Sequence, residues 1–350
     1  SSSQTLVLQY KITNGQLTAT RAFRLQWNYV DSRLEGSKLT LVQTQYTRYV
    51  ESWVDTKKLA RNLWASIIYN PDNGETTKTN SVIGCEKVQS FVGSTWTSAN
   101  VTLIRSLNLN DWTFAAQSAY LWNFGTLYLD QQWIIWTVTV DRPYTWCNGL
   151  ARCAMPAWQN NGQMIVTFEQ HNWAWTMSAA TPVIGYVPGQ YAIGRRPDGW
   201  HVVVTSDWNN GARTNVFSIG RNGVIRDAII NVAPRESFQS ARTIGGKLYL
   251  VTFEQTDPLF VINIWNPDKL TILGELVIPW FSSYLHPYAP ESNGKQYLIW
   301  LGQWPVSGNL VTTKVKGKTI TKRLPDEQWV KLDLYEIDFN KVRNWKISTK

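Results

Sequence analysis

The side chains that could carry acid–base or metal chemistry are few in this 350-residue sequence, which has three histidines. His171 follows Glu169 in FEQHNW and is the best candidate for a metal ligand or an acid–base pair, although a solvent-facing hydrogen bond is the commoner role. His201 lies in an apolar run, where we expect a packed core histidine. His286 in YLHPY precedes a proline and is expected to shape a turn. No G-x-S-x-G, P-loop or G-x-G-x-x-G motif occurs, so we expect no enzyme, no metal and no cofactor.

The three cysteines favour an oxidising compartment. In CNGLARC, Cys147 and Cys153 lie six residues apart, which suits a small disulfide loop in a secreted protein. Cys85 could instead pair with either of them, because a sequence alone does not fix the connectivity. A zinc site would need closer cysteine pairs and more histidines. The sequon NVT at Asn100 could accept a glycan in a secreted protein.

Tryptophan is the remaining candidate for binding chemistry, with 20 copies. Four lie in stretches that resemble loops or outer strands: Trp146 in YTWCNG, Trp158 in AMPAWQ, and Trp173 and Trp175 in HNWAWTM. A tryptophan in such a place can stack on a sugar or form the centre of a protein interface. More than half of the 20 are expected to fill space between packed sheets.

Charge and hydropathy exclude two classes of partner. The formal net charge is +9, and residues 314–350 hold an excess of Lys and Arg. Lysines in KVKGKTITKR suit a solvated edge strand, and the basic residues are not interleaved with aromatic ones as in a nucleic-acid site. No apolar run is long enough to span a membrane. The opening SSSQ, without Met or an apolar leader, suits a mature secreted protein or a trimmed chain.

The elements that would position these residues follow a repeat. The stretches DGWHVVVTS, GGKLYLVTF and NGKQYLIWL begin at Asp198, Gly245 and Asn293, which are 47 and 48 residues apart, and GSKLTLVQT and QQWIIWTVT resemble them. Each is a turn followed by a strand. In Leu248–Phe253 both faces are apolar, which is typical of a strand buried on both sides. A third and a fourth strand follow, separated by polar turns such as NPDKL.

Four antiparallel strands in about 47 residues are typical of a propeller blade. We therefore predict one all-β domain over residues 1–350, a β-propeller of about six four-stranded blades. The first is an N-terminal half-blade, LVLQYKITNGQLTATRAFRLQ, which supplies only third and fourth strands. The other five are predicted at 27–117, 118–186, 187–233, 234–280 and 281–350. Insertions are expected at 46–98, with a short helix at 51–65, at 140–162, and as a hairpin at 306–328.

Three segments carry a resemblance to a known family. They are residues 236–288 (ESFQSARTIGGKLYLVTFEQTDPLFVINIWNPDKLTILGELVIPWFSSYLHPY), residues 185–193 (GYVPGQYAI), and the N-terminal strand pair followed by residues 29–42 (YVDSRLEGSKLTLV). The chain resembles archaeal and bacterial secreted proteins with a C-terminal β-propeller domain that is distantly related to WD40 repeats. The resemblance implies an extracellular or surface location, and it carries no catalytic residues over. It also implies a further strand pair before the first blade and a further blade after Lys350, so an incomplete first blade is expected here.

These observations predict a non-catalytic structural or interaction module on the cell exterior. Its expected partners are copies of itself, which could supply the missing strands of the first blade and build a filament or surface layer. A carbohydrate- or glycoprotein-binding module that uses the loop tryptophans is an alternative, with surface glycans or cell-surface proteins as partners. An extracellular hydrolase is a second alternative. Nucleic acid is not expected as a partner.

Overall fold

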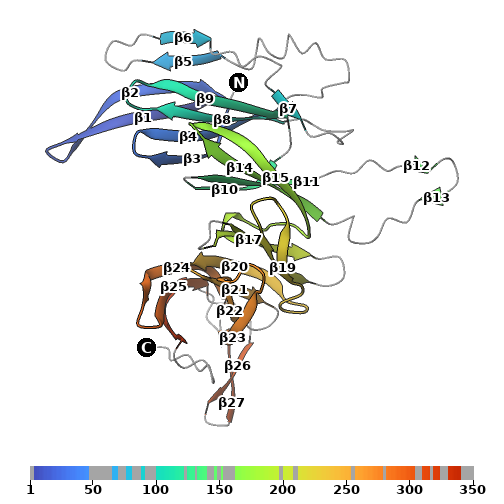
Figure 1. The fold of residues 1–350 in the computed structure, drawn as a ribbon. Helices are drawn as coiled ribbons and strands as arrows, with labels where there is room; N and C mark the ends of the chain where they lie inside the picture. Colours follow the sequence, from blue (N-terminus) through green and yellow to red (C-terminus); the bar gives the residue numbers. More distant parts are fainter. Residues whose placement is uncertain are drawn as a thin grey trace. The chain divides into compact units, whose positions relative to one another are not determined.

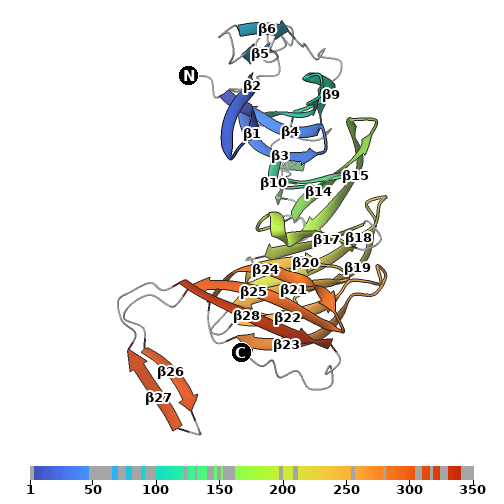
Figure 2. The same ribbon diagram turned by 90° about the vertical axis from the view of Figure 1, so that its left-hand side faces the viewer.

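The chain is described by a computed structural model that is built almost entirely of antiparallel strands (Figures 1 and 2). It divides into two compact units, residues 1–154 with 164–180 and residues 155–163 with 181–350. One short 3₁₀ helix, η3 (Gln190–Ala192), occurs among the described residues. The structure describes residues 4–46, 65–69, 76–80, 88–90, 100–121, 124–130, 132–139, 146–147, 151–152, 162–196, 200–207, 212–253, 257–278, 281–303, 310–315, 318–323 and 330–339.

The first sheet begins with the N-terminal hairpin. Its two strands, β1 (Gln4–Thr13) and β2 (Gln16–Gln26), pair antiparallel. Asn14 and Gly15 join them with positive φ angles of 51° and 76°, a turn whose twist suits a two-residue hairpin loop. The other edge of β2 pairs with β5 (Ala65–Tyr69), and β6 (Thr76–Asn80) completes the sheet. The insertion expected at 46–98 therefore supplies two strands to the first sheet.

The second and third sheets of the chain follow the repeat. The second sheet has the order β3 (Asn28–Glu35), β4 (Lys38–Tyr46), β8 (Asn100–Asn108), β9 (Thr113–Leu121) and β7 (Val88–Ser90). The third sheet has the order β10 (Phe124–Leu129), β11 (Trp133–Thr139), β14 (Gly162–His171) and β15 (Ala174–Ile184). The strands β12 (Trp146–Cys147) and β13 (Ala151–Arg152) form a small separate hairpin in the insertion expected at 140–162.

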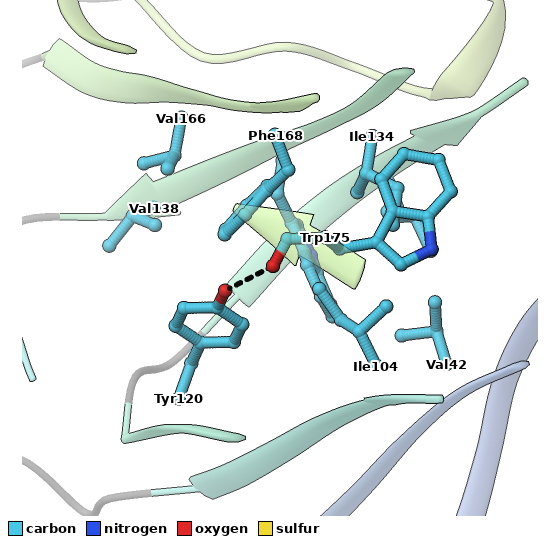
Figure 3. Close-up of a cluster of buried hydrophobic side chains, with 10 residues drawn as sticks. Val42, Ile104, Tyr120, Ile134, Val138, Val166, Phe168 and Trp175 are labelled. Carbon is cyan, nitrogen blue, oxygen red and sulfur yellow. Dashed lines mark hydrogen bonds between the residues drawn. The ribbon is translucent and has the colours of Figure 1, made fainter. Parts of the chain in front are cut away.

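A core of large apolar side chains joins the second sheet to the third (Figure 3). Ile104 and Tyr120 from the second sheet meet Trp136, Phe168 and Trp175 from the third. The ring of Tyr120 lies edge-on to Phe168 with centroids 4.9 Å apart. Its hydroxyl donates a 3.2 Å hydrogen bond to the carbonyl oxygen of Trp175, so the one polar atom of the ring is satisfied inside the core.

The second unit contains three further sheets. The fourth sheet has the order β16 (Ile193–Arg195), β17 (His201–Asp207), β18 (Arg213–Ile219) and β19 (Ile225–Ile229). The fifth has the order β20 (Ser237–Ile244), β21 (Lys247–Phe253), β22 (Asp257–Asn263) and β23 (Thr271–Ile278). The sixth has the order β24 (Phe281–Ser292), β25 (Lys295–Gln303) and β28 (Val330–Asp338). The hairpin of β26 (Leu310–Val315) and β27 (Lys318–Arg323) pairs with no other described strand (Figure 2).

The sheets of the second unit are in close contact at two interfaces, between the fifth and sixth sheets and between the fourth and fifth. Buried side chains of β21 and β22 pack against Leu285, Leu298 and Trp300 of the sixth sheet. Between the fourth and fifth sheets, a Cβ added to Gly194 would lie 1.9 Å from Thr243 Oγ1 and 2.5 Å from its Cβ. Only a glycine therefore fits where β16 passes β20.

Most of the expected strands are confirmed. Leu248, Tyr249, Leu250 and Val251 of β21 are all buried, as a strand covered on both sides requires, and the hairpin expected at 306–328 is β26–β27. The expected boundary between residues 117 and 118 is wrong, because β9 continues to Leu121. The helix expected at 51–65 lies outside the described residues except at its last position, which begins β5. The fourth strand expected in the blade at 281–350 would follow β28 and also lies outside them.

Candidate interaction surfaces

The N-terminal hairpin exposes an apolar face, which we call the N-terminal face. It consists of alternate residues of β1 and one residue of β2, and their side chains are between 41% and 72% exposed: Leu6, Leu8, Tyr10, Ile12 and Leu17. Alternate residues of a strand point to the same side of a sheet, so the β1 residues form one continuous stripe. Contiguous apolar stripes of this kind mark interaction surfaces more often than isolated exposed residues do.

The opposite face of the hairpin is fixed to the second sheet. Leu25 of β2 packs with Leu41 and Leu107 in a buried cluster. Thr5 accepts a 3.0 Å hydrogen bond from Gln43 Nε2 and donates a 2.7 Å bond to the carbonyl oxygen of Trp27. Because apolar packing and buried hydrogen bonds hold this side, the N-terminal face is presented in a fixed orientation relative to the second sheet.

The edge of β1 is open among the described residues. In the second to fifth sheets the fourth strand of the repeat (β9, β15, β19 and β23) is followed within nine residues by the first strand of the next sheet. β2 is followed in the same way by β3, so β2 holds the place of a fourth strand and β1 that of a third. The added strands β5 and β6 lie beyond β2. The positions of the first two strands, beside β1, are therefore not taken by any described strand.

The sixth sheet has a second apolar face, which we call the C-terminal face. It consists of Leu301, Leu332 and Leu334, which are 36% to 67% exposed. Leu301 of β25 lies opposite Leu332 of β28. The alternate residues Tyr335 and Ile337 are buried against the fifth sheet, so one side of β28 is buried and the other is exposed.

The far end of the C-terminal face is polar. Glu336 accepts a 2.8 Å hydrogen bond from Lys295 Nζ and a 2.6 Å bond from the Tyr297 hydroxyl. The hydrogen bond to Glu336 raises the pKa of Lys295 and that of Tyr297, because the carboxylate favours the protonated form of each donor. These groups form a polar margin beside the leucines.

A cluster of aromatic and basic side chains lies on the first strands of the fifth and sixth sheets and on η3; we call it the tyrosine–arginine cluster. The Arg242 guanidinium carbon lies 4.4 Å from the ring centroid of Tyr191 and 5.9 Å from that of Tyr284. The Tyr284 hydroxyl lies 3.1 Å from Nδ1 of His286. Tyr191 and His286 are exposed, so the cluster offers ring faces and cationic edges to a ligand.

Tyr191, Arg242 and Tyr284 were not predicted as members of a site, because they come from three separate segments of the sequence. The repeat places Arg242 in β20 and Tyr284 in β24 as first strands of successive sheets. A search for tyrosines at equivalent positions of the repeat could have found them. No local motif marks them.

The structure places the three histidines in different settings. His201 is buried in β17, as expected. His171 is exposed, and its Nε2 lies 3.6 Å from Oε2 of Glu169, so the two residues expected to act together are close. His286 lies inside β24, opposite Ile299 of β25, and not in a turn, because β24 continues through Pro287 with a bulge.

Of the tryptophans expected to bind ligands, Trp175 is in the core and only 2% exposed. Its ring packs between the second and third sheets, so the expectation of a surface role is corrected for this residue. Trp173 is half-buried, with a positive φ of 73° beside the turn that precedes β15. Trp146 begins β12. Trp158 lies outside the described residues.

The covalent sites remain predictions. Cys147 pairs with Ala151 in the β12–β13 hairpin, whereas Cys85 and Cys153 lie outside the described residues. Asn100 begins β8, and Thr102 of its sequon is buried. In the part of the chain that the structure describes, no group of three His, Cys, Asp or Glu side chains could hold a metal ion. The described residues also contain no helix with the length and hydrophobicity of a membrane span.

Successive antiparallel sheets, most of them made from one repeat of the chain and packed on neighbours through apolar faces, define the repeat architecture of β-propellers. The chain belongs to the Beta propeller domain family, whose model matches residues 1–346. This fold is of a kind that serves structural and protein-interaction roles, and the fold class expected from the sequence is confirmed.

Two archaeal proteins are similar to parts of the chain. An uncharacterized protein of Methanocaldococcus jannaschii is 32% identical over 108 residues, which cover 30% of this chain and 17% of that protein. An uncharacterized protein of Archaeoglobus fulgidus is 36% identical over 85 residues, which cover 24% of this chain and 13% of that protein. The matched part is thus a small share of each relative.

Two solved structures are also similar. BamB from Moraxella catarrhalis matches with a TM-score of 0.34 and 9% identity over 84% of this chain and 78% of that one. KlHsv2 with loop 6CD replaced by a Gly-Ser linker matches with a TM-score of 0.38 and 11% identity over 96% of this chain and 100% of that one.

Proposed function

We propose that the protein is a non-catalytic, extracellular structural module that assembles with copies of itself through its N-terminal hairpin. The single observation that supports this is the state of β1, which combines an open edge among the described strands with the exposed N-terminal face. A strand edge exposes unpaired N–H and C=O groups, which are a template for another chain. Addition of a strand from a second copy would satisfy those groups, and packing of the second copy against the hairpin would cover the apolar stripe.

Sedimentation velocity and negative-stain electron microscopy of the purified chain test this proposal. The average mass should rise with concentration, and rows of particles should form. Ile12→Lys should shift the protein towards monomer, because it places a charge in the apolar face. Leu34→Lys is the matched control, since Leu34 is an exposed leucine of β3 outside that face. Monomers at every concentration would refute self-assembly.

Hydrogen exchange tests whether strands are shared. On assembly, the amides of β1 should become protected, because a donated strand would bond to the open edge. β19 provides the comparison, as it is also an edge strand among the described residues but has no part in the proposal. Equal protection of both strands, or of neither, would argue against strand sharing.

A carbohydrate-binding role is a second candidate, favoured by the tyrosine–arginine cluster. Its exposed rings could stack on sugar faces, while Arg242 and His286 could donate hydrogen bonds to hydroxyl or carboxylate groups. A glycan array should then show binding that Tyr191→Ala weakens. Tyr186→Ala is the control, since Tyr186 is similarly exposed but outside the cluster. Binding that is absent, or equal in both variants, rules this role out.

A further inference from the structure

We infer that the N-terminal face of one molecule is covered by the C-terminal face of a second copy. This inference rests on the proposed self-assembly and identifies the second surface of the contact. Leu6, Leu8 and Tyr10 of one copy would pack against Leu332 and Leu334 of the next. The contact is a head-to-tail one, because the two faces come from different sheets of the chain.

The first argument is that both faces stand where another sheet would pack. The first sheet packs on the second through the side that carries Leu25, which leaves the N-terminal face on its other side. The sixth sheet packs on the fifth through Tyr335 and Ile337, which leaves the C-terminal face on its other side. A contact between the two faces would continue the sheet-on-sheet packing that already occurs within each unit.

The second argument is charge. The strands β1 and β2 contain basic residues and no Asp or Glu: Lys11, Arg21 and Arg24. The strands of the sixth sheet contain four acidic residues, Glu291, Asp333, Glu336 and Asp338, against Lys295 and Lys331. Arg21 lies over Trp112 and so faces the second sheet, and Glu291 is paired with Lys247. Glu336 and Asp338, in contrast, continue the alternate positions of Leu332 and Leu334 along β28. The opposite net charge of the two sheets therefore acts mainly at long range, where it favours the approach of unlike faces and disfavours that of two N-terminal faces.

The third argument concerns which assembly results. A contact between two different faces leaves one free face of each kind at the ends of a dimer, so further copies can add. A contact between identical faces would stop at two molecules. The arrangement therefore predicts assemblies larger than a dimer, as open rows or closed rings, whose growth needs both faces.

Mixing two variants tests the inference. Leu8→Lys blocks only the N-terminal face, and Leu332→Lys blocks only the C-terminal face. Each variant alone should lose self-association by at least ~10-fold in Kd, as for a central apolar contact residue. A mixture should form one-to-one dimers, because the intact C-terminal face of the first variant can bind the intact N-terminal face of the second.

Sedimentation velocity with one fluorescently labelled variant reports the mixed dimer directly. Ile230→Lys is the control in the second unit, because Ile230 is an exposed residue outside the C-terminal face; it should assemble as the wild type does. Circular dichroism must show that each variant is folded. If either is not, Leu6→Lys or Leu334→Lys replaces it.

Each other outcome has a definite meaning. A wild-type protein that stays monomeric would refute the proposed self-assembly and this inference together. A wild-type protein that assembles while Leu332→Lys also assembles would refute the inference alone. Variants that are monomeric both alone and mixed would also refute it, since the mixture would then contain an intact C-terminal face and an intact N-terminal face that do not bind each other.

Discussion

At the scale of single residues, two tryptophans separated by one position have different surroundings. Trp173 lies at the turn before β15 and is half-buried, whereas Trp175 is enclosed by Val42, Ile104 and Phe168 (Figure 3). Substitution of Trp175 therefore tests the fold and not ligand binding, and only Trp173 of the pair can report on a surface role.

We expect Trp175→Ala to lower the free energy of unfolding by about 3–5 kcal/mol, because it removes a buried aromatic ring and leaves a cavity. Trp265→Ala should change it by less than about 1 kcal/mol, since that side chain is 67% exposed. Chemical denaturation followed by circular dichroism measures both. Similar losses in the two variants would mean that Trp175 does not pack as described.

A second prediction concerns Gly194. An alanine there would place its Cβ 1.9 Å from Thr243 Oγ1, so β16 and β20 would have to separate at a cost of about 1–3 kcal/mol. Gly189→Ala is the control, because Gly189 is extended and has nothing within 4 Å of an added Cβ. Thermal unfolding should show a lower Tm for Gly194→Ala only. Combining Gly194→Ala with Thr243→Ala should restore part of the loss, since it removes the Oγ1 atom that lies closest to the added Cβ.

A third prediction concerns alkaline pH. Burial raises the pKa of Tyr120 to about 12, whereas an unfolded tyrosine ionises near 10. The folded state therefore holds this proton more tightly, and the stability it contributes is complete below pH 10 and is lost as pH rises towards 12. Arg105, whose pKa burial lowers to about 10, has the opposite effect in this range.

Comparison with Tyr120→Phe separates the two contributions, because Arg105 is common to both proteins. Although Tyr120→Phe loses the hydrogen bond to Trp175, its Tm should fall less steeply between pH 10 and 12 than that of the wild type. Calorimetry at several pH values measures the slopes. Parallel slopes would show that Tyr120 ionises normally in the folded protein.

At the scale of elements, the strands of the repeat could be predicted because their residue patterns are strong. β21 and β22 are apolar on both faces, and three polar residues separate them in the sequence before the Asp-Pro that begins β22, a pattern that a helix does not produce. β5 and β6 could not be predicted as parts of the first sheet, because ASIIY and TTKTN are short and do not show which edge they join. The tyrosine–arginine cluster was missed because it exists only when separate sheets pack together.

The β26–β27 hairpin should be dispensable for folding. Among the described strands it pairs only with itself, and Gln303 of β25 already lies opposite Val330 of β28, so a short loop can join the two strands. Replacing residues 306–328 with a Gly-Ser linker should change the Tm by no more than about 4 °C, which corresponds to about 1 kcal/mol or less. A large loss of Tm would show that the hairpin packs on the rest of the second unit.

At the scale of the whole molecule, the net charge of +9 and the sequence pI near 9.4 oppose association at neutral pH. Copies that carry the same net charge repel one another, and the repulsion weakens as pH approaches the pI. Self-association should therefore be tighter at pH 9 than at pH 6. In 1 M NaCl, where the screening length is about 3 Å, the difference should largely disappear. Sedimentation velocity at the two pH values and salt concentrations measures this, and an unchanged affinity would show that net charge does not govern assembly.

The first two sheets are interleaved along the chain: the segment between β4 and β8 leaves the second sheet, adds β5 and β6 beside β2, and then returns. Among the described strands, β2 is thus paired on both sides and β1 on one. A mechanical pull on the N-terminus would peel β1 away from β2 one residue pair after another at low force. The rest of the first sheet would resist, because its strands are anchored by a later part of the same chain. A protein held by its N-terminus would therefore lose the pairing of β1 first, while its buried core stayed folded.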